Sequence, residues 1–369
     1  MNFNLTDRLI LLTLDGSRAY GMNIENSDVD LKGVCIPPLQ YYLGFKESFE
    51  QADSPIHMNH FYTLLNKEEQ EASDSSKLEG SVYELRKFFK LATDNNPNIL
   101  SILFCRDEDV RFITPIGQKL RDNRDTFLST RCRWTFSGYA RSQLNRIESH
   151  RKWLLNPITH RPTRAEFGLA EVPVIDKNQL AAAEAAVRKK VDSWEIDFDQ
   201  LDPATKIYIL NQLYKNLAEI EVTSKSKFNA AARLVGYEEN FLHSLQKERE
   251  YKAAYINWKQ YCDWKINRNK ERAVLEAKCG YDTKNASHLI RLFRMCSEIL
   301  EKGNVNIYRE DAGELLDIRN GKWSYDKLIE FANNEEDRLD SLFKNSSLPR
   351  IPPIKALDDL CVSLIDEML

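Results

Sequence analysis

The residues in this chain best suited to chemistry are Gly16-Ser17 and, after ten intervening residues, Asp28-Val29-Asp30. The apolar run from Arg8 to Leu14 predicts a buried strand that ends at the Gly-Ser turn. A helix that begins at such a turn offers free backbone N–H groups, and these suit a phosphate together with the Ser17 hydroxyl. The turn therefore predicts a phosphate-binding loop.

Asp28 and Asp30 open a second predicted strand, which runs to Ile36. Because side chains alternate between the two faces of a strand, both carboxylates point to the same face. Mg²⁺ prefers a few carboxylates plus substrate phosphates, and two such ions can hold the attacking and leaving oxygens of a phosphoryl displacement. The combined pattern predicts metal-dependent nucleotidyl transfer. Either half alone would favour a surface turn or two solvated acids.

These two motifs resemble the signature of the polymerase-β nucleotidyltransferase superfamily. Within it, the chain is similar to the predicted bacterial and phage nucleotidyltransferases, a branch that includes RNA-repair-associated members. The resemblance covers most of the chain and is weakest at about residues 165–280. The motifs that carry it are GSRAYG at 16–21, SDVD at 27–30, PLQYYLG at 38–44, YELRKF at 83–88, NPNIL at 96–100, ASHLIRL at 286–292 and IRNGKW at 318–323.

The resemblance implies an NTP substrate, Mg²⁺ or Mn²⁺, and a third carboxylate on a strand next to the aspartate pair. Two residues compete for that role. Glu84 lies in the branch-like motif, but Ser81-Val-Tyr-Glu84 also reads as a capping box that starts a helix. Glu79 lies just before that helix, at the end of a short predicted strand. We therefore expect Glu79 to join Asp28 and Asp30 as metal ligand and catalytic residue, with Glu84 as the alternative.

The expected nucleotide-binding residues surround the Gly-Ser turn. Gly16 lets the backbone approach a phosphate closely, and Ser17 binds a β- or γ-phosphate oxygen. Arg18 and Lys32 are expected to supply further positive charge, although exposed basic residues near a turn are common. The helix from Lys284 to Arg294 is expected to pack beside the catalytic domain, and by resemblance it contacts substrate.

The expected fold class is α+β. A polymerase-β-like catalytic domain with a small mixed sheet is expected at residues 1–110. A mainly helical domain is expected at 111–369, with a less family-like helical insertion at about 165–280. Within these domains we expect a hairpin from 49–53 and 56–65 and an exposed loop at 66–77. The helices expected further on include 134–155, 179–194, a hairpin of 204–236 and 240–279, 285–302, 324–343 and 356–368.

A basic stretch follows the predicted sheet. Residues 111–164 hold twelve Lys and Arg against three acids, a net charge of +9 in a chain whose net charge is −4. A local positive field attracts phosphates, so we expect this stretch to bind a polyanionic acceptor. A solvated set that partly covers the core is the alternative, because its members do not all share one helix face. The residues expected to hold the acceptor are Arg131, Arg133, Arg141 and Arg151.

RNA, either a tRNA or a broken RNA end, is the favoured acceptor, because phosphate contacts drive RNA binding. The alternative is nucleotide transfer to a protein or a small molecule. A degenerate scaffold that only binds nucleotide is disfavoured by the intact Asp28 and Asp30. The base preference, the number of nucleotides added and the oligomeric state do not follow from the residues.

Composition favours a cytoplasmic protein. The seven cysteines are scattered and odd in number, and none forms a C-x-x-C pair, which is typical of reduced thiols. The six histidines lack zinc-ligand spacing. No stretch is apolar enough to predict a membrane span, and the N-terminus does not resemble a signal peptide.

Overall fold

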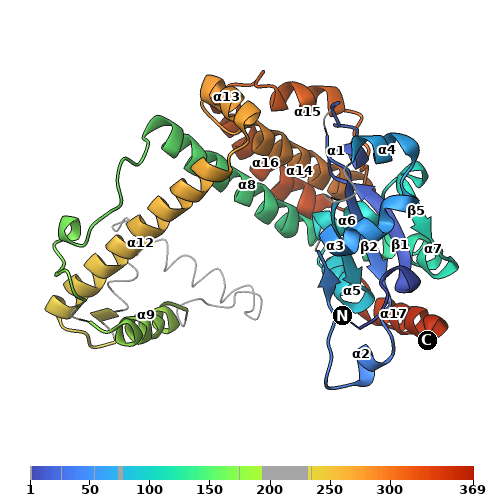
Figure 1. Cartoon of the computed structure of the whole chain (residues 1–369), viewed down its shortest axis with the longest axis horizontal. Coiled ribbons are helices and arrows are strands. Elements are labelled where there is room, and N and C mark those ends of the chain that lie inside the picture. The colour runs from blue at the N-terminus through green and yellow to red at the C-terminus, as the bar shows by residue number, and fades with distance from the viewer. Residues whose placement is uncertain are drawn as a thin grey trace. The chain divides into compact units, whose positions relative to one another are not determined.

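A computed structural model describes residues 2–25, 27–53, 55–73, 78–173, 175–192, 232–233 and 235–369. The chain divides into two compact units, coloured along the sequence in Figure 1. The first unit comprises Met1–Asn156 and Asn269–Leu369, and the second comprises Pro157–Arg268. Nearly all of the helix expected at 204–236 lies outside the described residues.

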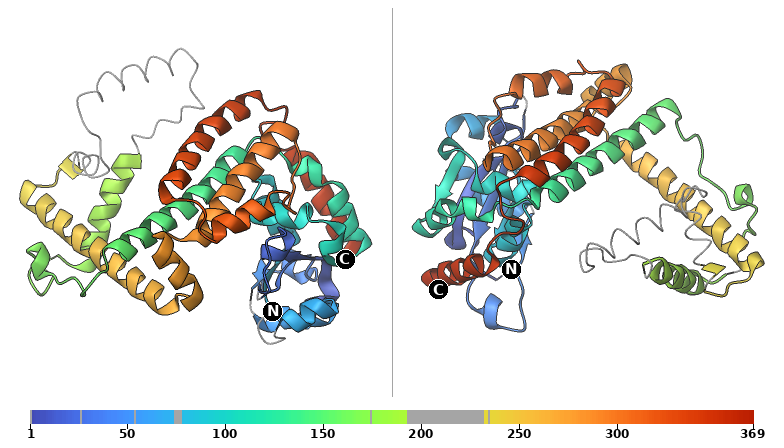
Figure 2. Two further views of the ribbon diagram at one scale, coloured as in Figure 1. Left: turned by 90° about the horizontal axis from the view of Figure 1, so that it is seen from above. Right: turned by 180° about the vertical axis from the view of Figure 1, so that it is seen from behind.

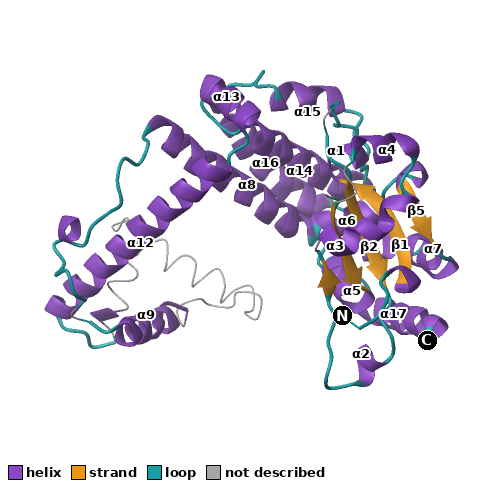
Figure 3. Cartoon of the chain, in the orientation of Figure 1, coloured by secondary structure: helices purple, strands orange, loops and turns teal. Residues whose placement is uncertain are grey.

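Five strands form one mixed sheet in the first unit, shown in orange in Figure 3. Strand β1 pairs antiparallel with β2 and β5, β2 pairs in parallel with β4, and β4 pairs antiparallel with β3. This small mixed sheet, followed by helices, confirms the expected α+β class. In spatial order the strands are β3 (Gln51–Ala52), β4 (Glu79–Glu84), β2 (Asp30–Cys35), β1 (Leu9–Asp15) and β5 (Val110–Ile113).

Strand β1 is buried on both faces, and this explains its continuous apolar run. Ile10 and Leu11 belong to one hydrophobic cluster, which includes residues of the helices that follow β4 and of the C-terminal helices. Leu12 and Leu14 belong to a second cluster with Met58 and Phe61. A strand covered on both sides reads as an unbroken apolar segment rather than an alternating one.

Helices cover the sheet and continue from it. Helices α8 and α14 pack against each other along the first unit, as both views in Figure 2 show. The C-terminal helix α17 contacts α5 and α7, so the two ends of the chain share one unit. The helices of this unit are α1 (Gly16–Ala19), α2 (Gln40–Leu43), α3 (Pro55–Met58), α4 (Lys67–Ala72), α5 (Leu85–Thr93), α6 (Pro97–Leu103), α7 (Pro115–Asp122), α8 (Cys132–Leu155), α13 (Lys270–Cys279), α14 (Thr283–Lys302), α15 (Ala312–Arg319), α16 (Tyr325–Asn345) and α17 (Ile354–Met368).

Two expected features between β3 and β4 were wrong. Residues 56–65 are helical rather than a strand, forming most of α3 and a 3-10 helix over Asn59–Leu64. The segment expected to be a loop contains α4, because Asn66 and Glu69 cap that helix reciprocally. Glu69 is also buried against the guanidinium of Arg111, so a distant residue stabilises this acidic segment.

The long helical arm expected at 240–279 is two helices. Helix α12 spans Glu239–Asn267, and α13 begins after Asn269, whose side chain accepts a hydrogen bond from the Arg272 N–H at 3.0 Å. This cap starts a new helix and ends the second unit there. The second unit also contains α9 (Lys177–Asp192), where Glu184 lies 3.5 Å from Lys252.

The boundary expected at residue 110 coincides with the start of β5. Because β5 pairs with β1, the sheet continues to Ile113. The compact units divide instead after Asn156 and after Arg268. A functional division into catalytic and helical domains at residue 110 stays a prediction.

Candidate active site

Three carboxylates stand in one row across neighbouring strands. Asp15 at the end of β1 is the register partner of Asp30 at the start of β2, and Asp30 is the register partner of Glu79 at the start of β4. Asp28 precedes Asp30 by two residues and is exposed. The row arises because β1 runs antiparallel to β2 while β2 runs parallel to β4, so one strand end and two strand starts meet at the same edge.

The Gly-Ser turn lies directly against this row. Gly16 has a φ of +62°, a conformation that favours glycine. A Cβ atom at this position would lie 1.9 Å from Oδ2 of Asp30. Both the backbone conformation and the contact therefore require glycine, which brings the start of α1 against the carboxylate.

The carboxylates of this row carry more negative charge than the neighbouring basic residue Lys32 neutralises. Burial, followed by the charges of Asp15, Glu79 and Asp28, raises the pKa of Asp30 to about 6 from 3.8. The positive charge of Lys32 acts in the opposite direction but does not outweigh these effects. Among the described residues, no group of three or more His, Cys, Asp or Glu side chains is already placed to hold a metal ion. The crowding of carboxylates around Asp30 is nonetheless the charge distribution that a divalent cation relieves.

Lys32 is directed into the fold rather than toward an open phosphate site. Its Nζ atom lies 2.7 Å from Oδ2 of Asp15 and donates to the carbonyl oxygen of Asn98 at 3.0 Å. The Asp15 carboxylate holds the pKa of Lys32 above its usual value despite burial, which alone would lower it. Oδ1 of Asp15 is buried without a hydrogen-bond partner in the described part of the chain. Lys32 thus neutralises one end of the carboxylate row.

Ser17 and Arg18 extend from the short helix α1. Ser17 is half-buried, and its hydroxyl makes no hydrogen bond to another described side chain or backbone group. Arg18 donates from Nη2 to the carbonyl oxygen of Ser27 at 3.3 Å, and the Ser27 hydroxyl accepts from the Ile24 N–H at 2.8 Å. Arg18 therefore helps to hold the loop that leads to Asp28, while the Ser17 hydroxyl is available to a ligand.

Comparison with known proteins identifies the domain that carries this edge. Residues 3–161 match the family described as RlaP, the RNA repair pathway DNA polymerase beta family. This match covers less than half of the chain and supports a polymerase-β-like nucleotidyltransferase of a branch linked to RNA repair. The matched segment contains every residue of the carboxylate row.

One curated relative and the solved structures complete the comparison. An uncharacterized 38.9 kDa protein from the nrdC-mobD intergenic region of Enterobacteria phage T4 is 22% identical over 339 residues. The similarity covers 90% of this chain and 88% of the phage protein, so it extends past the RlaP segment into the C-terminal helices. No solved structure matches the chain. None of the helices described here is both long and apolar enough to cross a membrane.

Glu79 and Glu84, the two candidates for the third carboxylate, occupy different environments. Glu84 is buried, and its carboxylate accepts hydrogen bonds from the Arg86 and Lys87 N–H groups at 2.9 and 3.0 Å. It is therefore the N-cap of α5. Glu79 is exposed at the edge of the sheet, in register with Asp30. The carboxylate row thus includes Glu79, while Glu84 stabilises the following helix.

The capping box expected at Ser81–Glu84 was wrong. These residues are extended because they pair in parallel with β2, and the helix begins three residues later than expected, at Leu85. The capping function exists, but Glu84 itself supplies it. The later helix start allows β4 to place Glu79 beside Asp30.

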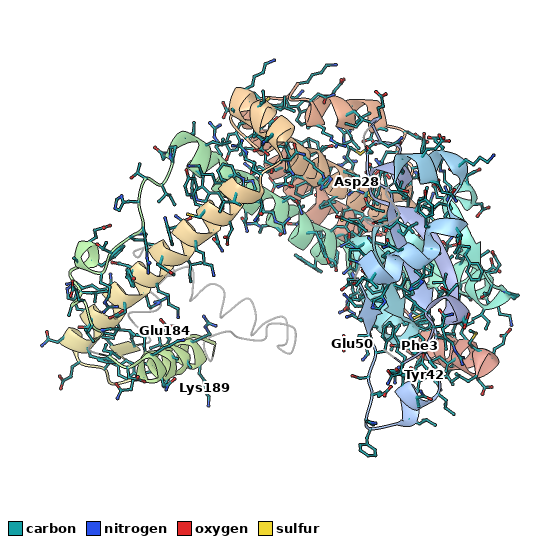
Figure 4. The ribbon with its side chains drawn as sticks, viewed as in Figure 1. Phe3, Asp28, Tyr42, Glu50, Glu184 and Lys189 are labelled. Atoms are coloured by element: carbon teal, nitrogen blue, oxygen red, sulfur yellow. The ribbon has the colours of Figure 1, made fainter. Side chains whose placement is uncertain are left out.

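Sequence reasoning singled out the helix from Lys284 to Arg294 but did not name three individual cations of the C-terminal helices as site residues. Lys284 interacts electrostatically with Asp28 and Asp30, Arg291 stacks on Tyr20, and Arg319 donates to the carbonyl oxygen of Met22 at 3.5 Å. Asp28, labelled in Figure 4, lies on the side of the sheet where α14 is found. The expectation that the helix from Lys284 to Arg294 packs beside the RlaP segment is consistent with these contacts. A signal was present, since Lys284, His288 and Arg291 have the spacing of one helix face.

The basic stretch of the RlaP segment is largely paired within the fold. Arg133 is buried, and its guanidinium contacts Ser137, Glu336 and Asp340. Arg151 donates to the carbonyl oxygen of Gly280 at 2.8 Å and lies 4.2 Å above the Tyr325 ring. These contacts engage both side chains in holding the helices together.

The other two expected acceptor residues are more accessible. Arg131 lies 2.9 Å from Asp94, and 44% of its side chain is exposed. Arg141 lies 3.6 Å from Glu336, and 68% of its side chain is exposed. Exposed pairs of this kind are weak and readily exchange for another anion. Of the four expected residues, Arg131 and Arg141 present the most charge to solvent.

Proposed function

We propose that this protein transfers a nucleoside monophosphate from an NTP to the hydroxyl group of an RNA, a tRNA or a broken RNA end, with the help of Mg²⁺ or Mn²⁺. The observation that carries the proposal is the row of Asp15, Asp30 and Glu79, with Asp28 beside it. The RlaP match supports nucleotidyl transfer in RNA repair. The metal, the donor and the acceptor are our inferences from the residues.

Asp28, Asp30 and Glu79 are the proposed metal ligands. They fit this role because burial, followed by the charges of the neighbouring carboxylates Asp15, Glu79 and Asp28, raises the pKa of Asp30. A divalent cation would offset this accumulation of negative charge. When bound, divalent cations would stabilise negative charge on the reacting phosphate oxygens. In the transfer, the acceptor hydroxyl oxygen loses its proton to water and bonds to the α-phosphorus. The bond between that phosphorus and the oxygen that bridges it to the β-phosphate breaks, and pyrophosphate leaves.

The Gly-Ser turn is the proposed site for the NTP phosphates. Gly16 presents backbone without a side chain, and the Ser17 hydroxyl is not used within the described fold. A hydrogen bond to a charged group contributes about 1.5–3 kcal/mol. We therefore expect Ser17→Ala to weaken NTP binding about 10- to 150-fold by calorimetry, with little change in melting temperature. Ser27→Ala is the control and should instead destabilise the loop, because the Ser27 hydroxyl accepts from the Ile24 N–H.

The decisive experiment offers the full chain α-labelled NTPs with tRNA, nicked RNA, a protein mixture or buffer alone, in Mg²⁺, in Mn²⁺ and in EDTA. The proposal expects label on RNA, only with metal and not with Asp30→Asn. Label on protein would move the function to protein nucleotidylation. Hydrolysis or binding without transfer would refute transfer altogether.

The affinity for RNA should fall as the salt concentration rises, and the steepness of this fall should depend on the residues that contact RNA phosphates. Each neutralised phosphate contributes roughly 0.7–0.9 to the log–log slope of affinity against salt. Arg141→Glu should reduce this slope, because Arg141 is exposed and only loosely paired. Lys355→Glu, which reverses an exposed charge on α17, should leave it unchanged. A slope that Arg141→Glu leaves untouched would remove Arg141 from the acceptor site.

A further inference from the structure

Two arginines of the C-terminal helices are anchored to the segment that links the Gly-Ser turn to the aspartate pair. The Arg291 guanidinium carbon lies 3.4 Å from the centroid of the Tyr20 ring. Arg319 donates to the carbonyl oxygen of Met22. The Arg309 N–H donates to the carbonyl oxygen of Tyr20 at 3.2 Å, which ties the segment before α15 to the same place. Basic side chains far along the sequence therefore lie beside the carboxylate edge.

Lys284 and Arg291 lie on one face of α14, seven residues apart, with His288 between them. The charges of Asp28 and Asp30 act on Lys284, which places this face of the helix within electrostatic range of both carboxylates. Lys284 and Arg291 carry the positive charge of this face, because His288 has a pKa lowered to about 3 and is neutral at pH 7.

The charges on this surface lack the partners that neighbouring arginines have. Across the described residues, Lys284, Arg291 and Arg319 form no ion pair within 4.0 Å of a carboxylate. By contrast, Arg294, one turn further along α14, pairs with Asp311 and Glu314 at 2.6 and 2.8 Å. Of the two arginines on this helix, Arg294 is neutralised and Arg291 has no carboxylate partner among the residues that the structure describes.

Arg291 also has unused hydrogen-bond donors. Its Nε and Nη1 atoms are buried and have no acceptor among the described groups. Buried donors without partners are costly, and charged ones most of all. The Arg291 guanidinium stacks on an aromatic ring and has two nitrogen atoms without acceptors among the described groups. It therefore suits a ligand with several acceptor oxygens.

Burial and the concentration of positive charge both lower the pKa of basic groups on this surface. Burial, then the charges of Arg291, Lys284, Arg272 and Arg319, lowers the pKa of His288 to about 3. Burial and the charges of Arg272 and Arg319 lower the pKa of Lys284. Arg272 is itself paired with Glu276 and Asp282. The remaining three cations repel one another, and an anion would relieve that repulsion.

We propose that Lys284, Arg291 and Arg319 form a phosphate-binding site opposite the carboxylate row, filled by the polyphosphate of the NTP or by a terminal phosphate of the RNA. This proposal rests on the proposed function, since it supplies a second anchor for one of its substrates. Phosphate fits because its oxygens accept several guanidinium N–H bonds at once. A site between fixed cations and metal-binding carboxylates would hold a phosphate against the reacting edge.

The test measures binding, with no requirement for turnover. Inorganic tripolyphosphate, NTP, nucleoside monophosphate, and RNA with and without a terminal phosphate are titrated into the full chain by calorimetry, at fixed salt. Variants are Arg291→Gln, Lys284→Gln and Arg291→Lys, with Arg294→Gln as the matched control on the same helix. Melting temperatures accompany each variant, and Lys284→Gln decides the question if Arg291→Gln fails to fold.

For an NTP site, we expect Arg291→Gln and Lys284→Gln to lose at least tenfold in affinity for tripolyphosphate and NTP. Nucleoside monophosphate should change less, and Arg291→Lys should recover part of the affinity. For an RNA-end site, only RNA with a terminal phosphate should weaken. If neither ligand weakens, or if Arg294→Gln weakens binding equally, the proposal is overturned.

This outcome is separable from that of the proposed function. If phosphate affinity depends on Arg291 but the protein transfers no nucleotide to RNA, the proposed phosphate site is supported and the proposed function is refuted. If nucleotide transfer depends on Asp30 but phosphate binding is unchanged in Arg291→Gln and Lys284→Gln, the proposed function is supported and the proposed phosphate site is refuted.

Discussion

A Cβ atom on Gly16 would overlap Oδ2 of Asp30 at 1.9 Å, so the Gly-Ser turn and the central carboxylate leave no room for a side chain between them. The two motifs that stand apart in the sequence are therefore one structural unit. Asp30 in turn is in register with Glu79 on the neighbouring strand. The geometry of the whole edge depends on this contact.

Gly16→Ala should destabilise the protein and abolish nucleotide transfer. The substitution imposes a side chain on a φ of +62° and forces the Asp30 carboxylate to move. We expect a loss of at least about 1–3 kcal/mol in the free energy of unfolding, measured with urea. Gly138→Ala is the control: it lies within α8, where a Cβ meets nothing within 4 Å, and should stabilise by about 0.5–1 kcal/mol. Equal effects at both glycines would contradict the close contact.

Asp30→Asn should stabilise the metal-free protein while it removes activity. The pKa of Asp30 is raised to about 6 in the fold from 3.8, so the folded state holds its proton more tightly than the unfolded chain. Stability is therefore lost as pH rises from 3.8 to 6, and the penalty stays constant above that range. Asparagine removes the charge and with it the penalty.

At pH 8 we expect Asp30→Asn to gain on the order of 1–3 kcal/mol in the free energy of unfolding. The gain should vanish below about pH 3, where Asp30 is mostly protonated in both states. Urea titrations at the two pH values measure this directly. Glu25→Gln, which neutralises an exposed acid in the loop before Asp28, should show no such gain. Near wild-type NTP turnover by Asp30→Asn would show that Asp30 is not a metal ligand.

Glu79→Gln and Glu84→Gln should have opposite consequences. Glu84 caps α5 with two hydrogen bonds, so its loss should cost about 0.5–2 kcal/mol of stability. Glu79 is exposed beside Asp30, so its loss should lower turnover and metal affinity with little change in melting temperature. Metal titrations and thermal melts of both variants distinguish the two roles. The reverse pattern would make Glu84 the third carboxylate.

His288 should make the protein less stable in acid. Burial and the surrounding cations lower the pKa of His288 to about 3, whereas an unfolded histidine titrates near 6.5. Below pH 6.5 the unfolded chain binds a proton at this histidine, whereas the folded state does not. The free energy of unfolding therefore falls as the pH drops toward 3. The slope contributed by this residue is at most about 1.4 kcal/mol per pH unit.

His288→Gln removes that proton and should flatten the decline in unfolding free energy between pH 6.5 and 4.5. His160→Gln, in which 68% of the replaced side chain is exposed, is the control and should keep the wild-type slope. Chemical denaturation across this range measures all three proteins. An unchanged slope in His288→Gln would indicate that another group causes the acid sensitivity.

Several features of the candidate site follow from local sequence. An apolar run that ends in Gly-Ser, followed by an Asp-x-Asp strand start, predicts adjacent strands and carboxylates on one face, because strand periodicity is a local property. The predicted mixed sheet is confirmed. Glu79 was favoured over Glu84 as the third carboxylate because Glu84 was already explained as part of a capping box. In the structure Glu84 does cap a helix, but as the N-cap residue itself.

Long-range packing decided the rest. Register between β2 and β4 aligns Asp30 with Glu79, and no local pattern specifies which residues of two distant strands become partners. The same limit applies to charge: residues 111–164 carry a net charge of +9, yet Arg133 is neutralised by acids more than two hundred residues away.

What the sequence by itself determined is the identity and spacing of the reactive groups, since these depend on residue type and local backbone periodicity. Only the tertiary structure decided which charges remain available. Lys32 was expected to face a nucleotide, but the fold pairs it with Asp15. The helix that carries Lys284 and Arg291 was expected to contact substrate, but neither residue was singled out, and the packing of α14 brings both to the carboxylate edge. Pairing of this kind depends on which surfaces of the chain become buried together, and that is a property of the whole fold.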